Sequence, residues 1–427
     1  MGRSTDCTVI GASFAGLACA SELAQAGANV TILERKADVG AKLHTTGIIV
    51  KDAIDQVALL DGLPGALVRR IDGVRLYAPN LRHVDLAAPG YYFLATDTPE
   101  LMRWLAGRAE DAGVRIDYRA SFASCDRRAD GFDLGEHGTT RYLVGADGPN
   151  SRVAKVLGLG QNTRFLFGVE YEYADLEIPD ADQLHCFIDR RLAPGYIGWV
   201  VAGVGAVQVG LARRVREAQP SADAAMTGFL EKISPFFDFR AKRPASVRAG
   251  MIPVGGVVSP VAAPGALLVG DAAGMVSPVT AGGIHTALKH GAAGGRAIAD
   301  YLQGRGEDPA CAFVGTYPTF RLKRWRRFLF DHFQSDLAFN LLLGTRPMRA
   351  AASIVYFHRK GVFNPPDKTA FAARFGSRVL NPGQCRAQSY MNFMLRTARR
   401  IAGVVHAIGI YPYGIICRFS SYKPILI

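Results

Sequence analysis

Three glycine-rich segments of the chain carry residues that could bind a nucleotide. In the first, "CTVIGASFAGLACASELAQAGANVTILERK" (7–36), Gly11 and Gly16 flank Ser13 between an apolar run and a helical pattern. A phosphate-binding turn needs a sharp bend, close approach of the backbone to the phosphates and tight helix–strand packing. Gly11 can make the bend and Gly16 the packing. Ser13 replaces the usual middle glycine, but it is small and could donate to a phosphate oxygen.

The acid that ends this segment indicates which dinucleotide would bind. Glu34 closes the second apolar run, where a carboxylate accepts hydrogen bonds from ribose hydroxyls in such sites. An acid here disfavours a 2′-phosphate and therefore NADP as the resident ligand, although Arg35 and Lys36 follow it. A second glycine run, "GVGAVQVG" (203–210), has no helix after it and is predicted to be a hairpin turn. NAD(P)H, or another electron donor, is therefore expected to bind only transiently.

The other two glycine-rich segments indicate a flavin. "LVGADGPNS" (143–151) and "GALLVGDAAGMVSPVTAGGIHTALKHG" (265–291) each follow an apolar strand pattern. Asp271 leaves the second strand where it could accept from ribityl hydroxyls. The helix that starts near Gly282 directs N–H groups at an electron-rich group such as the N1–C2=O edge of a reduced flavin. Gly282 and Gly283 would let the flavin ring lie against bare backbone.

The three segments, in this order, resemble the glutathione-reductase-like FAD superfamily and its p-hydroxybenzoate-hydroxylase-like branch. More narrowly, "GMIPVGG" (250–256) followed by "LLVGDAAGMVSPVTAGGIHTAL" (267–288) is similar to the geranylgeranyl reductase family. The superfamily resemblance covers about residues 1–305. It implies FAD as the cofactor.

The resemblance also implies which residues contact the FAD. The pyrophosphate would lie on the first glycine turn, at Gly11, Ser13, Phe14, Ala15 and Gly16. The residues expected along the rest of the cofactor are Glu34, Arg35, Lys42, Thr98, Phe122, Asp147, Gly148, Asp271, Pro278, Gly282, Gly283 and Ile284. Thr98 departs from the family, which usually has Arg or Gln there. An Arg that often follows the Asp147-Gly148 pair is also absent, since Ala154 and Lys155 take its place.

The elements that must position these residues are discontinuous in the chain. The nucleotide motifs lie at 7–36, 141–152 and 266–290, and alternating apolar runs at 164–250 predict an antiparallel sheet between the last two. The fold class expected is α/β (α+β overall), with a discontinuous Rossmann-like FAD-binding domain. The domains expected are FAD binding (1–163 with 251–315), an inserted antiparallel-sheet substrate domain (164–250, which part of 41–95 could join) and a helical C-terminal region (316–427).

Two segments could touch a substrate. In "AKLHTTGIIV" (41–50), which the family layout places beside the flavin, His44 could donate a proton and Thr45 and Thr46 could orient a substrate or water. The threonines could equally be caps, and a lone His is often structural. "PGYIGWVV" (194–201) resembles the family's aromatic substrate strand. Its Tyr196 and Trp199 would face opposite ways in a regular strand.

The C-terminal region combines basic and apolar residues. In 320–333, Trp325, Phe328, Leu329 and Phe333 share one helical face among arginines. This pattern suits a helix on anionic lipid, or one packed on the FAD domain with solvated arginines. Residues 396–417 are apolar but too few to span a bilayer. The net charge of +13 favours an acidic partner, and no nucleic-acid motif is present.

These observations predict an FAD-dependent oxidoreductase. The favoured reaction is hydride transfer from reduced FAD to a carbon–carbon double bond of a hydrophobic, isoprenoid-like substrate. The alternatives are an FAD monooxygenase that uses NAD(P)H and oxygen, and a binding protein that FAD only stabilises. Seven scattered cysteines, with no Cys-x-x-Cys pair, argue against a zinc or other metal site. They fit a cytoplasmic protein, with peripheral membrane contact possible through 320–333 and 396–417.

Overall fold

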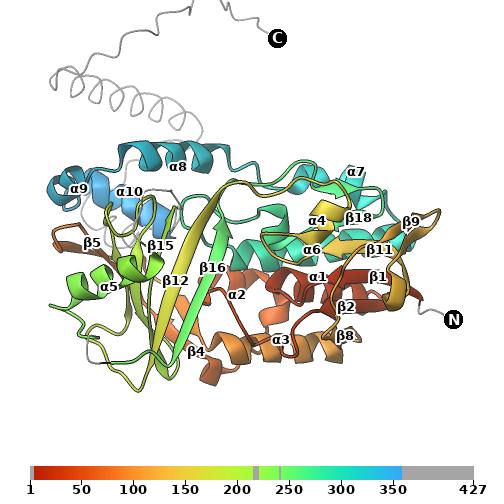
Figure 1. The fold of residues 1–427 in the computed structure, drawn as a ribbon, viewed down its shortest axis with the longest axis horizontal. Helices are drawn as coiled ribbons and strands as arrows, with labels where there is room; N and C mark the ends of the chain where they lie inside the picture. Colours follow the sequence, from red (N-terminus) through yellow and green to blue (C-terminus); the bar gives the residue numbers. More distant parts are fainter. Residues whose placement is uncertain (1–3, 215–220, 240–241, 358–427) are drawn as a thin grey trace, which may run out of the picture. The chain divides into compact units, whose positions relative to one another are not determined.

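The computed structural model describes residues 4–214, 221–239 and 242–357, which belong to the unit Met1–Asn364. The strands in these residues form two large sheets and a small third one (Figure 1). The pattern of apolar runs in the sequence therefore corresponds to a mixed α/β fold, as predicted.

The first large sheet contains the nucleotide motifs and is mainly parallel. Its central strands are almost completely buried, which explains why they read as continuous apolar runs. In spatial order its strands are β17 (Ala262–Ala263), β18 (Ala266–Leu268), β11 (Thr139–Gly145), β1 (Ser4–Ile10), β2 (Val30–Glu34) and β8 (Arg115–Tyr118). β9 (Asp126–Arg128) and β10 (Gly131–Asp133) pair with each other, and β10 pairs antiparallel with β11. This sheet is the Rossmann-like element predicted from the sequence.

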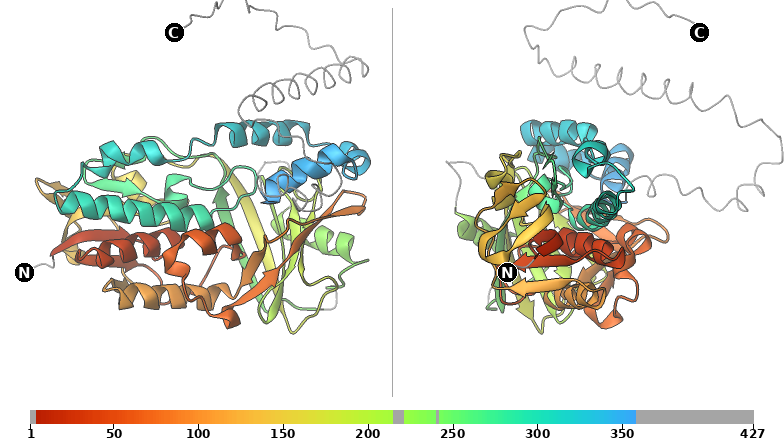
Figure 2. Two further views of the ribbon diagram at one scale, coloured as in Figure 1. Left: turned by 180° about the vertical axis from the view of Figure 1, so that it is seen from behind. Right: turned by 90° about the vertical axis from the view of Figure 1, so that its right-hand side faces the viewer.

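Three long helices accompany this sheet: α1 (Phe14–Gln25), α3 (Thr98–Asp111) and α6 (Ile284–Leu302). α6 lies beside α1 (Figure 2), and glycines make the close approach possible. A Cβ atom on Gly291 would lie 2.4 Å from the Ala15 carbonyl oxygen, and one on Gly295 would lie 2.3 Å from that of Cys19. This contact fixes the third motif against the first. Shorter helices are α2 (Lys51–Gln56), α4 (Arg152–Val156) and α7 (Pro309–Ala312).

The second large sheet has seven strands. In spatial order they are β16 (Ser246–Pro253), β12 (Phe165–Ala174), β15 (Ala206–Arg214), β14 (Gly198–Ala202), β13 (Gln183–Phe187), β5 (Gly73–Tyr77) and β6 (His83–Leu86). Two of these strands come from residues 73–86, and β5 pairs with β13 in parallel, so the sheet is not purely antiparallel. β14 and β15 form the hairpin predicted around 203–210, where the Gly203 N–H donates to the Ala206 carbonyl at 2.8 Å.

The two faces of this sheet pack against different partners. One face of the sheet packs against α5 (Ala222–Ile233), a helix that lies within the region 164–250 for which an antiparallel sheet was predicted. We call the other side the inner face. Leu166, Ala212 and Ile252 lie on it and pack with Ala281 of the third motif. The inner face therefore borders the loop on which the sequence places the flavin ring.

A small sheet links these parts, with β3 (Ile48–Val50), β7 (Phe93–Thr96) and β4 (Val68–Ile71) in the order β3-β7-β4. The chain then continues into α8 (Arg321–Phe333), α9 (Asp336–Leu342) and α10 (Arg346–Phe357), which confirms helices over this part of the C-terminal region. Residues 396–417 lie outside the described part. Within the described residues, no helix has both the length and the apolar character needed to cross a membrane.

Candidate active site

The first glycine turn has the geometry that its sequence predicts. Gly11 has φ +100°, and a Cβ atom there would lie 2.7 Å from the Ala146 carbonyl oxygen. A Cβ atom on Gly16 would lie 2.1 Å from the Gly11 carbonyl oxygen. Ser13 is the N-cap of α1: its Oγ accepts from the Gly16 N–H at 3.2 Å and donates to the Ala146 carbonyl at 3.0 Å. Ser13 therefore joins the first motif to the second.

Glu34 is buried beside this turn. Its Oε2 accepts from the Ala12 N–H and its Oε1 from the Lys36 N–H, both at 2.9 Å. The carboxylate thus fixes the turn from the end of β2. Arg35 is exposed next to it. The segment that contains Phe122 begins nearby, because the Ala120 N–H donates to the Glu34 carbonyl at 3.0 Å. The residues expected around the adenosine are therefore neighbours in space.

The Asp147 side chain in the second motif is turned towards its own helix. Its Oδ1 accepts from the Ser151 hydroxyl at 2.6 Å, and its Oδ2 accepts from the Arg152 and Val153 N–H groups at 2.6 and 3.1 Å. These contacts cap the start of α4. Gly148 follows with φ +85°, so it reverses the chain at this point. Any contribution of this motif to FAD would come from the loop that the capping holds in place.

Asn162 joins the second motif to the third. Its Nδ2 donates to the carbonyls of Pro149 and Asp271 at 3.0 and 2.9 Å. A polar pocket of about 100 Å³ lies at this junction and includes Lys155 in its wall. The three motifs, far apart in the sequence, therefore form one continuous surface.

Asp271 stands at the end of β18 with a carboxylate that is ready to accept hydrogen bonds. No hydrogen bond to this carboxylate comes from the described residues, and loss of surrounding water raises the pKa of Asp271 to about 6. α6 begins after Gly283, and no side chain among the described residues caps it. Ribityl hydroxyls could donate hydrogen bonds to the free carboxylate of Asp271. An electron-rich ring edge could accept hydrogen bonds from the uncapped N–H groups at the start of α6. The residues present therefore fit FAD.

The loop before α6 is held from two sides. The Tyr196 hydroxyl donates to the Thr280 carbonyl, and Arg327 of α8 donates to the Pro278 carbonyl at 3.5 Å. Ala281 has φ +49°. Thus Tyr196, just before β14, and Arg327 of α8 hold the loop that is expected under the flavin ring, which contains Pro278, Gly282, Gly283 and Ile284.

The segment 41–47 lies against the inner face of the seven-stranded sheet. His44 Nδ1 is 2.5 Å from the Ala249 carbonyl of β16, and Thr46 Oγ1 donates to Glu170 Oε2 at 2.6 Å. Thr45 Oγ1 accepts from the Gly47 N–H at 3.3 Å, which is a local turn contact. Lys42 is exposed with φ +48°. Of the three candidate residues, Thr46 thus makes the contact that ties the segment to a buried charge.

Thr98 helps to hold the same segment. Thr98 is the first residue of α3, whose N-cap is Asp97; the Asp97 side chain accepts from the Glu100 N–H at 3.2 Å. Thr98 Oγ1 instead donates to the Thr46 carbonyl at 3.4 Å, and Thr96 Oγ1 donates to the Gly47 carbonyl at 2.8 Å. The hydroxyl at 98 therefore supports the loop beside the candidate flavin site.

Tyr196 and Trp199 pack into the same cluster, which corrects the expectation that they face opposite ways. β14 begins at Gly198, so Tyr196 lies in the preceding turn and strand alternation does not apply to the pair. Both contact the Leu166–Ala212 cluster of the inner face. Trp199 lies over Gly210, where a Cβ atom would come within 2.3 Å of its ring. At this point the inner face is therefore formed by aromatic and aliphatic side chains.

Sequence reasoning missed the buried charges of this site. Glu170 is 4% exposed on β12, and Arg248 of β16 lies between it and Glu172. The signal was available, since "GVEYEYA" puts two acids on one side of an otherwise apolar strand. Arg327 was expected among arginines that face either lipid or solvent, but it is buried and paired with Asp331.

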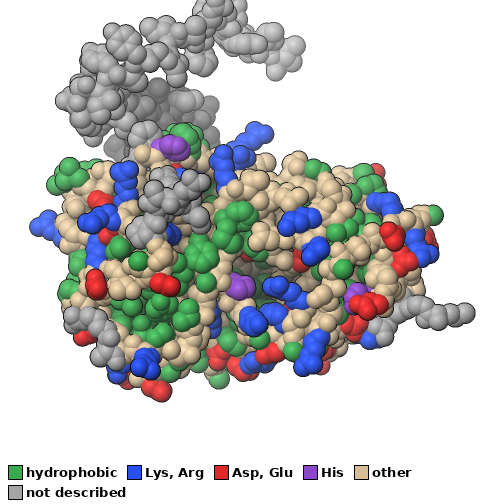
Figure 3. All heavy atoms as spheres, in the orientation of Figure 1, with side chains coloured by type: hydrophobic (Ala, Val, Ile, Leu, Met, Phe, Trp, Pro, Cys, Tyr) green, Lys and Arg blue, Asp and Glu red, His purple; other side chains and the backbone are tan. Residues whose placement is uncertain are grey.

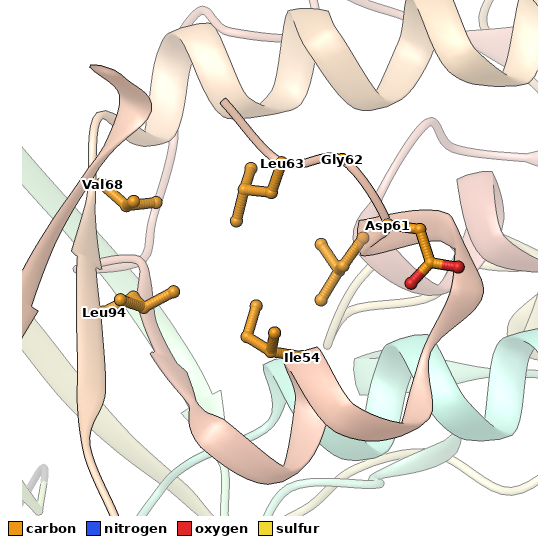
Figure 4. A pocket seen from close by; sticks show the side chains of 7 residues that line it. Ile54, Asp61, Gly62, Leu63, Val68 and Leu94 are labelled. Atoms are coloured by element: carbon orange, nitrogen blue, oxygen red, sulfur yellow. The ribbon is translucent and has the colours of Figure 1, made fainter. Parts of the chain in front are cut away.

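An apolar pocket of about 300 Å³ lies elsewhere, between α2, the segment 60–63 and strands β4 and β7 (Figure 4). Ile54, Leu63, Val68 and Leu94 point into it, with Asp61 at its edge. None of its lining residues belongs to the three glycine-rich motifs. It is therefore separate from the candidate cofactor site. The face in Figure 3 is also hollowed between the two large sheets, and Lys, Arg and His side chains border the hollow.

The fold and its three motifs define an FAD-dependent oxidoreductase, and the comparisons with known proteins agree. Residues 4–326 match the family described as "FAD binding domain". Digeranylgeranylglycerophospholipid reductase 1 of Methanopyrus kandleri is 30% identical over 345 residues, which cover 77% of this chain and 88% of that protein. Reductase 2 of the same organism is 29% identical over 326 residues, 73% of this chain and 81% of that protein.

A solved structure supports the same assignment at the level of the fold. It is a geranylgeranyl bacteriochlorophyll reductase-like protein of Thermoplasma acidophilum, with a TM-score of 0.72 and 16% identity. The match covers 85% of this chain and 98% of that protein. The chain belongs to the FAD-binding-domain family and, within it, to the geranylgeranyl-reductase-like oxidoreductases, which confirms the resemblance found in the sequence.

Proposed function

We propose that the protein reduces carbon–carbon double bonds of a hydrophobic, isoprenoid-like substrate. When bound, reduced FAD would supply the hydride. The observation that carries this proposal is the apolar inner face, where Tyr196, Trp199 and Ile252 lie opposite Ala281 of the flavin loop. Such a wall can hold an alkene chain and exclude water from it. The names of the reductase relatives support the same substrate class.

The chain's own residues would have three tasks in this reaction. Asp271 and the uncapped start of α6 would bind and orient the cofactor, and the inner face would bind the alkene. Tyr196 would keep the flavin loop against the substrate sheet through its bond to the Thr280 carbonyl. NAD(P)H or another donor would reduce the FAD without a resident site.

Anaerobic turnover tests the proposed reaction. We expect enzyme with reduced FAD to be reoxidised by a geranylgeranyl lipid without oxygen, and the lipid to gain the mass of H2 for each bond reduced. Absorbance of the flavin and mass spectrometry of the lipid would measure both. Flavin that is reoxidised only by oxygen, with an oxygenated product, would contradict the reductase and support the monooxygenase.

We also propose that the protein contacts an anionic membrane from the cytoplasmic side. Six of the ten most exposed large apolar side chains of the described residues lie on α8 and α9. Leu322, Trp325 and Phe328 are 60%, 58% and 52% exposed, and exposed arginines at 321, 324 and 326 lie among them. This arrangement suits a helix that inserts apolar side chains between anionic headgroups. The five described cysteines are free thiols, as in a reducing compartment. Residues 396–417 would add a second contact.

Loss of Trp325 and Phe328 should weaken membrane binding. Each large apolar side chain buried in lipid contributes about 1.5–3 kcal/mol, so Trp325→Ala/Phe328→Ala should bind phosphatidylglycerol vesicles at least about a hundredfold less tightly. Co-sedimentation would measure this, with phosphatidylcholine vesicles as the neutral surface. Phe236→Ala removes an exposed aromatic side chain away from α8 and should bind like the unchanged protein. Equal binding of all three proteins would contradict the proposed surface.

A further inference from the structure

Glu170 connects the two walls of the candidate site through one carboxylate oxygen. Its Oε2 accepts from Thr46 Oγ1 of the 41–47 segment at 2.6 Å and from Trp199 Nε1 of β14 at 2.9 Å. The other oxygen, Oε1, is buried and has no hydrogen-bond partner among the described residues. A buried carboxylate oxygen without a donor is costly, whereas the same oxygen in a neutral carboxylic acid is much less so.

The surrounding charges also favour a proton on Glu170. Arg248 Nη1 lies 3.7 Å from Glu170 Oε1, but its Nη2 is closer to Glu172 Oε1, at 2.7 Å. One guanidinium therefore serves two carboxylates. The other side chains that donate to these two carboxylates are neutral: Thr46 and Trp199 donate to Glu170, and Gln208 of β15 donates to Glu172. Two carboxylates that share one cation become balanced when one of them keeps its proton.

Solvent exclusion acts in the same direction. Burial raises the pKa of Glu170, and the nearby Glu172 adds to this, while Thr46, Trp199 and Arg248 act against it. The other titratable groups on the 41–47 segment are Lys42, which is exposed, and His44, which is held on the Ala249 carbonyl. Of the groups around Thr46, Glu170 is thus the acid that combines burial, a raised pKa and a direct hydrogen bond to the loop.

We propose that Glu170 supplies the proton of the reduction and that Thr46 passes it to the substrate. In the resting site the Thr46 hydroxyl donates to Glu170 Oε2. For the transfer this hydroxyl turns about its Cβ–Oγ bond towards the alkene, and the acid proton lies on Oε2. Glu170 Oε2 then gives its proton to Thr46 Oγ1 as the Thr46 hydroxyl proton forms a C–H bond on one alkene carbon. When bound, reduced FAD would supply the hydride for the C–H bond on the other carbon, so that the π bond is replaced by two C–H bonds. Glu170 is left as a carboxylate and takes a proton from water. This inference rests on the proposed reductase function.

The structure holds Thr46 firmly for such a task. Its carbonyl accepts from Gln208 Nε2 at 3.2 Å and from Thr98 Oγ1 at 3.4 Å. Next to it, a Cβ atom on Gly47 would lie 2.0 Å from Thr98 Oγ1, so the chain is closely packed on both sides. The hydroxyl oxygen of Thr46 therefore has little freedom to leave Glu170.

A spectroscopic titration tests the protonation of Glu170 without turnover. The chain has three tryptophans, so Trp104→Phe and Trp325→Phe assign the indole N–H resonance of Trp199 in ¹⁵N-labelled holoenzyme. We expect this resonance to shift with a midpoint above the usual value for Glu, about 4.3, and the shift to be absent in Glu170→Gln. The amide still accepts from Trp199 and Thr46 but carries no titrating proton. A Trp199 resonance that moves equally in both proteins would overturn the proposal.

Single-turnover kinetics test the proton transfer itself. We expect Glu170→Gln to slow reoxidation of the reduced flavin by a polyprenyl alkene about a hundredfold or more, with FAD content unchanged. The wild-type rate should fall as pH rises through the raised pKa of Glu170, because only the protonated acid can donate, and Glu170→Gln should lack this limb. Thr46→Val should be slow as well, and Thr46→Ser should restore the rate. The exposed Glu177→Gln is the matched control and should behave like wild type.

The outcomes separate this inference from the proposed function. If the wild-type enzyme reduces no polyprenyl alkene, the reductase function fails, whatever the titration shows. If the wild type turns over and Glu170→Gln matches its rate, the reductase stands and Glu170 is not the proton source. A slow Glu170→Gln enzyme that keeps the wild-type pH limb would show that Glu170 only positions Trp199 and Thr46.

Discussion

Gly16→Val is expected to yield protein without FAD. A Cβ atom at this position would lie 2.1 Å from the Gly11 carbonyl oxygen, and backbone cannot move away without opening the phosphate turn. Overpacking of a rigid contact costs about 1–3 kcal/mol or more, and each 1.4 kcal/mol is a tenfold change in affinity. We therefore expect FAD to bind about a hundredfold less tightly. The ratio of flavin to protein absorbance after purification, and FAD titration of the apoprotein, would measure this.

Two control variants distinguish loss of FAD caused by the phosphate turn from loss of FAD caused by general destabilisation of a helix. Gly107 lies in α3, and a Cβ atom there would have no other atom within 4 Å, so Gly107→Val should keep FAD. Ser13→Gly should also keep it, since replacing an N-cap serine by glycine costs only a few tenths of a kcal/mol. Normal FAD binding by Gly16→Val would contradict the assignment of this turn to the pyrophosphate.

The local geometry of the candidate cofactor site was readable from the sequence because its determinants are close together in the chain. Gly11, Gly16 and Glu34 belong to one strand–helix–strand unit, and each conformational demand falls on a residue type that meets it. The third motif was similarly readable, because Asp271 and Gly283 lie at the ends of one short strand and one helix. The residues of each motif are close together in the sequence, so both motifs could be recognised without knowledge of the tertiary structure.

The reacting side of the site was not readable, because long-range strand pairing creates it. Glu170 meets Arg248 through the β12–β16 pair and Trp199 through the inner face, and neither neighbour is close in sequence. Part of 41–95 was expected to be able to join this sheet, but the pattern did not show that β5 pairs with β13 in parallel. The alternation of apolar and polar residues along a strand shows which residues share one face of the sheet. It does not show which strand will pair with it.

The sequence left the orientation of α8 open between an apolar face on lipid and a helix packed on the FAD domain. In the structure Arg327 and Asp331 form the buried contact, while Trp325 and Phe328 face outward. A helical wheel weights apolar residues towards the core. It cannot recognise a buried ion pair whose partners, Arg214 and the Pro278 carbonyl, come from other elements.

Asp331→Asn should destabilise the protein through this buried pair. Arg327 Nε donates to Asp331 Oδ2 at 3.0 Å, and both side chains are almost fully buried (8% and 7% exposed). Desolvation and the nearby Arg214 lower the pKa of Arg327 to about 10, and Asp331 is the carboxylate that accepts a hydrogen bond from this guanidinium. Removing one partner of a buried pair costs about 3–5 kcal/mol. Urea unfolding followed by tryptophan fluorescence would measure the loss in free energy of unfolding.

Asp300→Asn is the control variant. It breaks the exposed pair with Arg305 and should lower the free energy of unfolding by less than about 1 kcal/mol. Equal costs for the two variants would show that α8 is held by its apolar contacts alone.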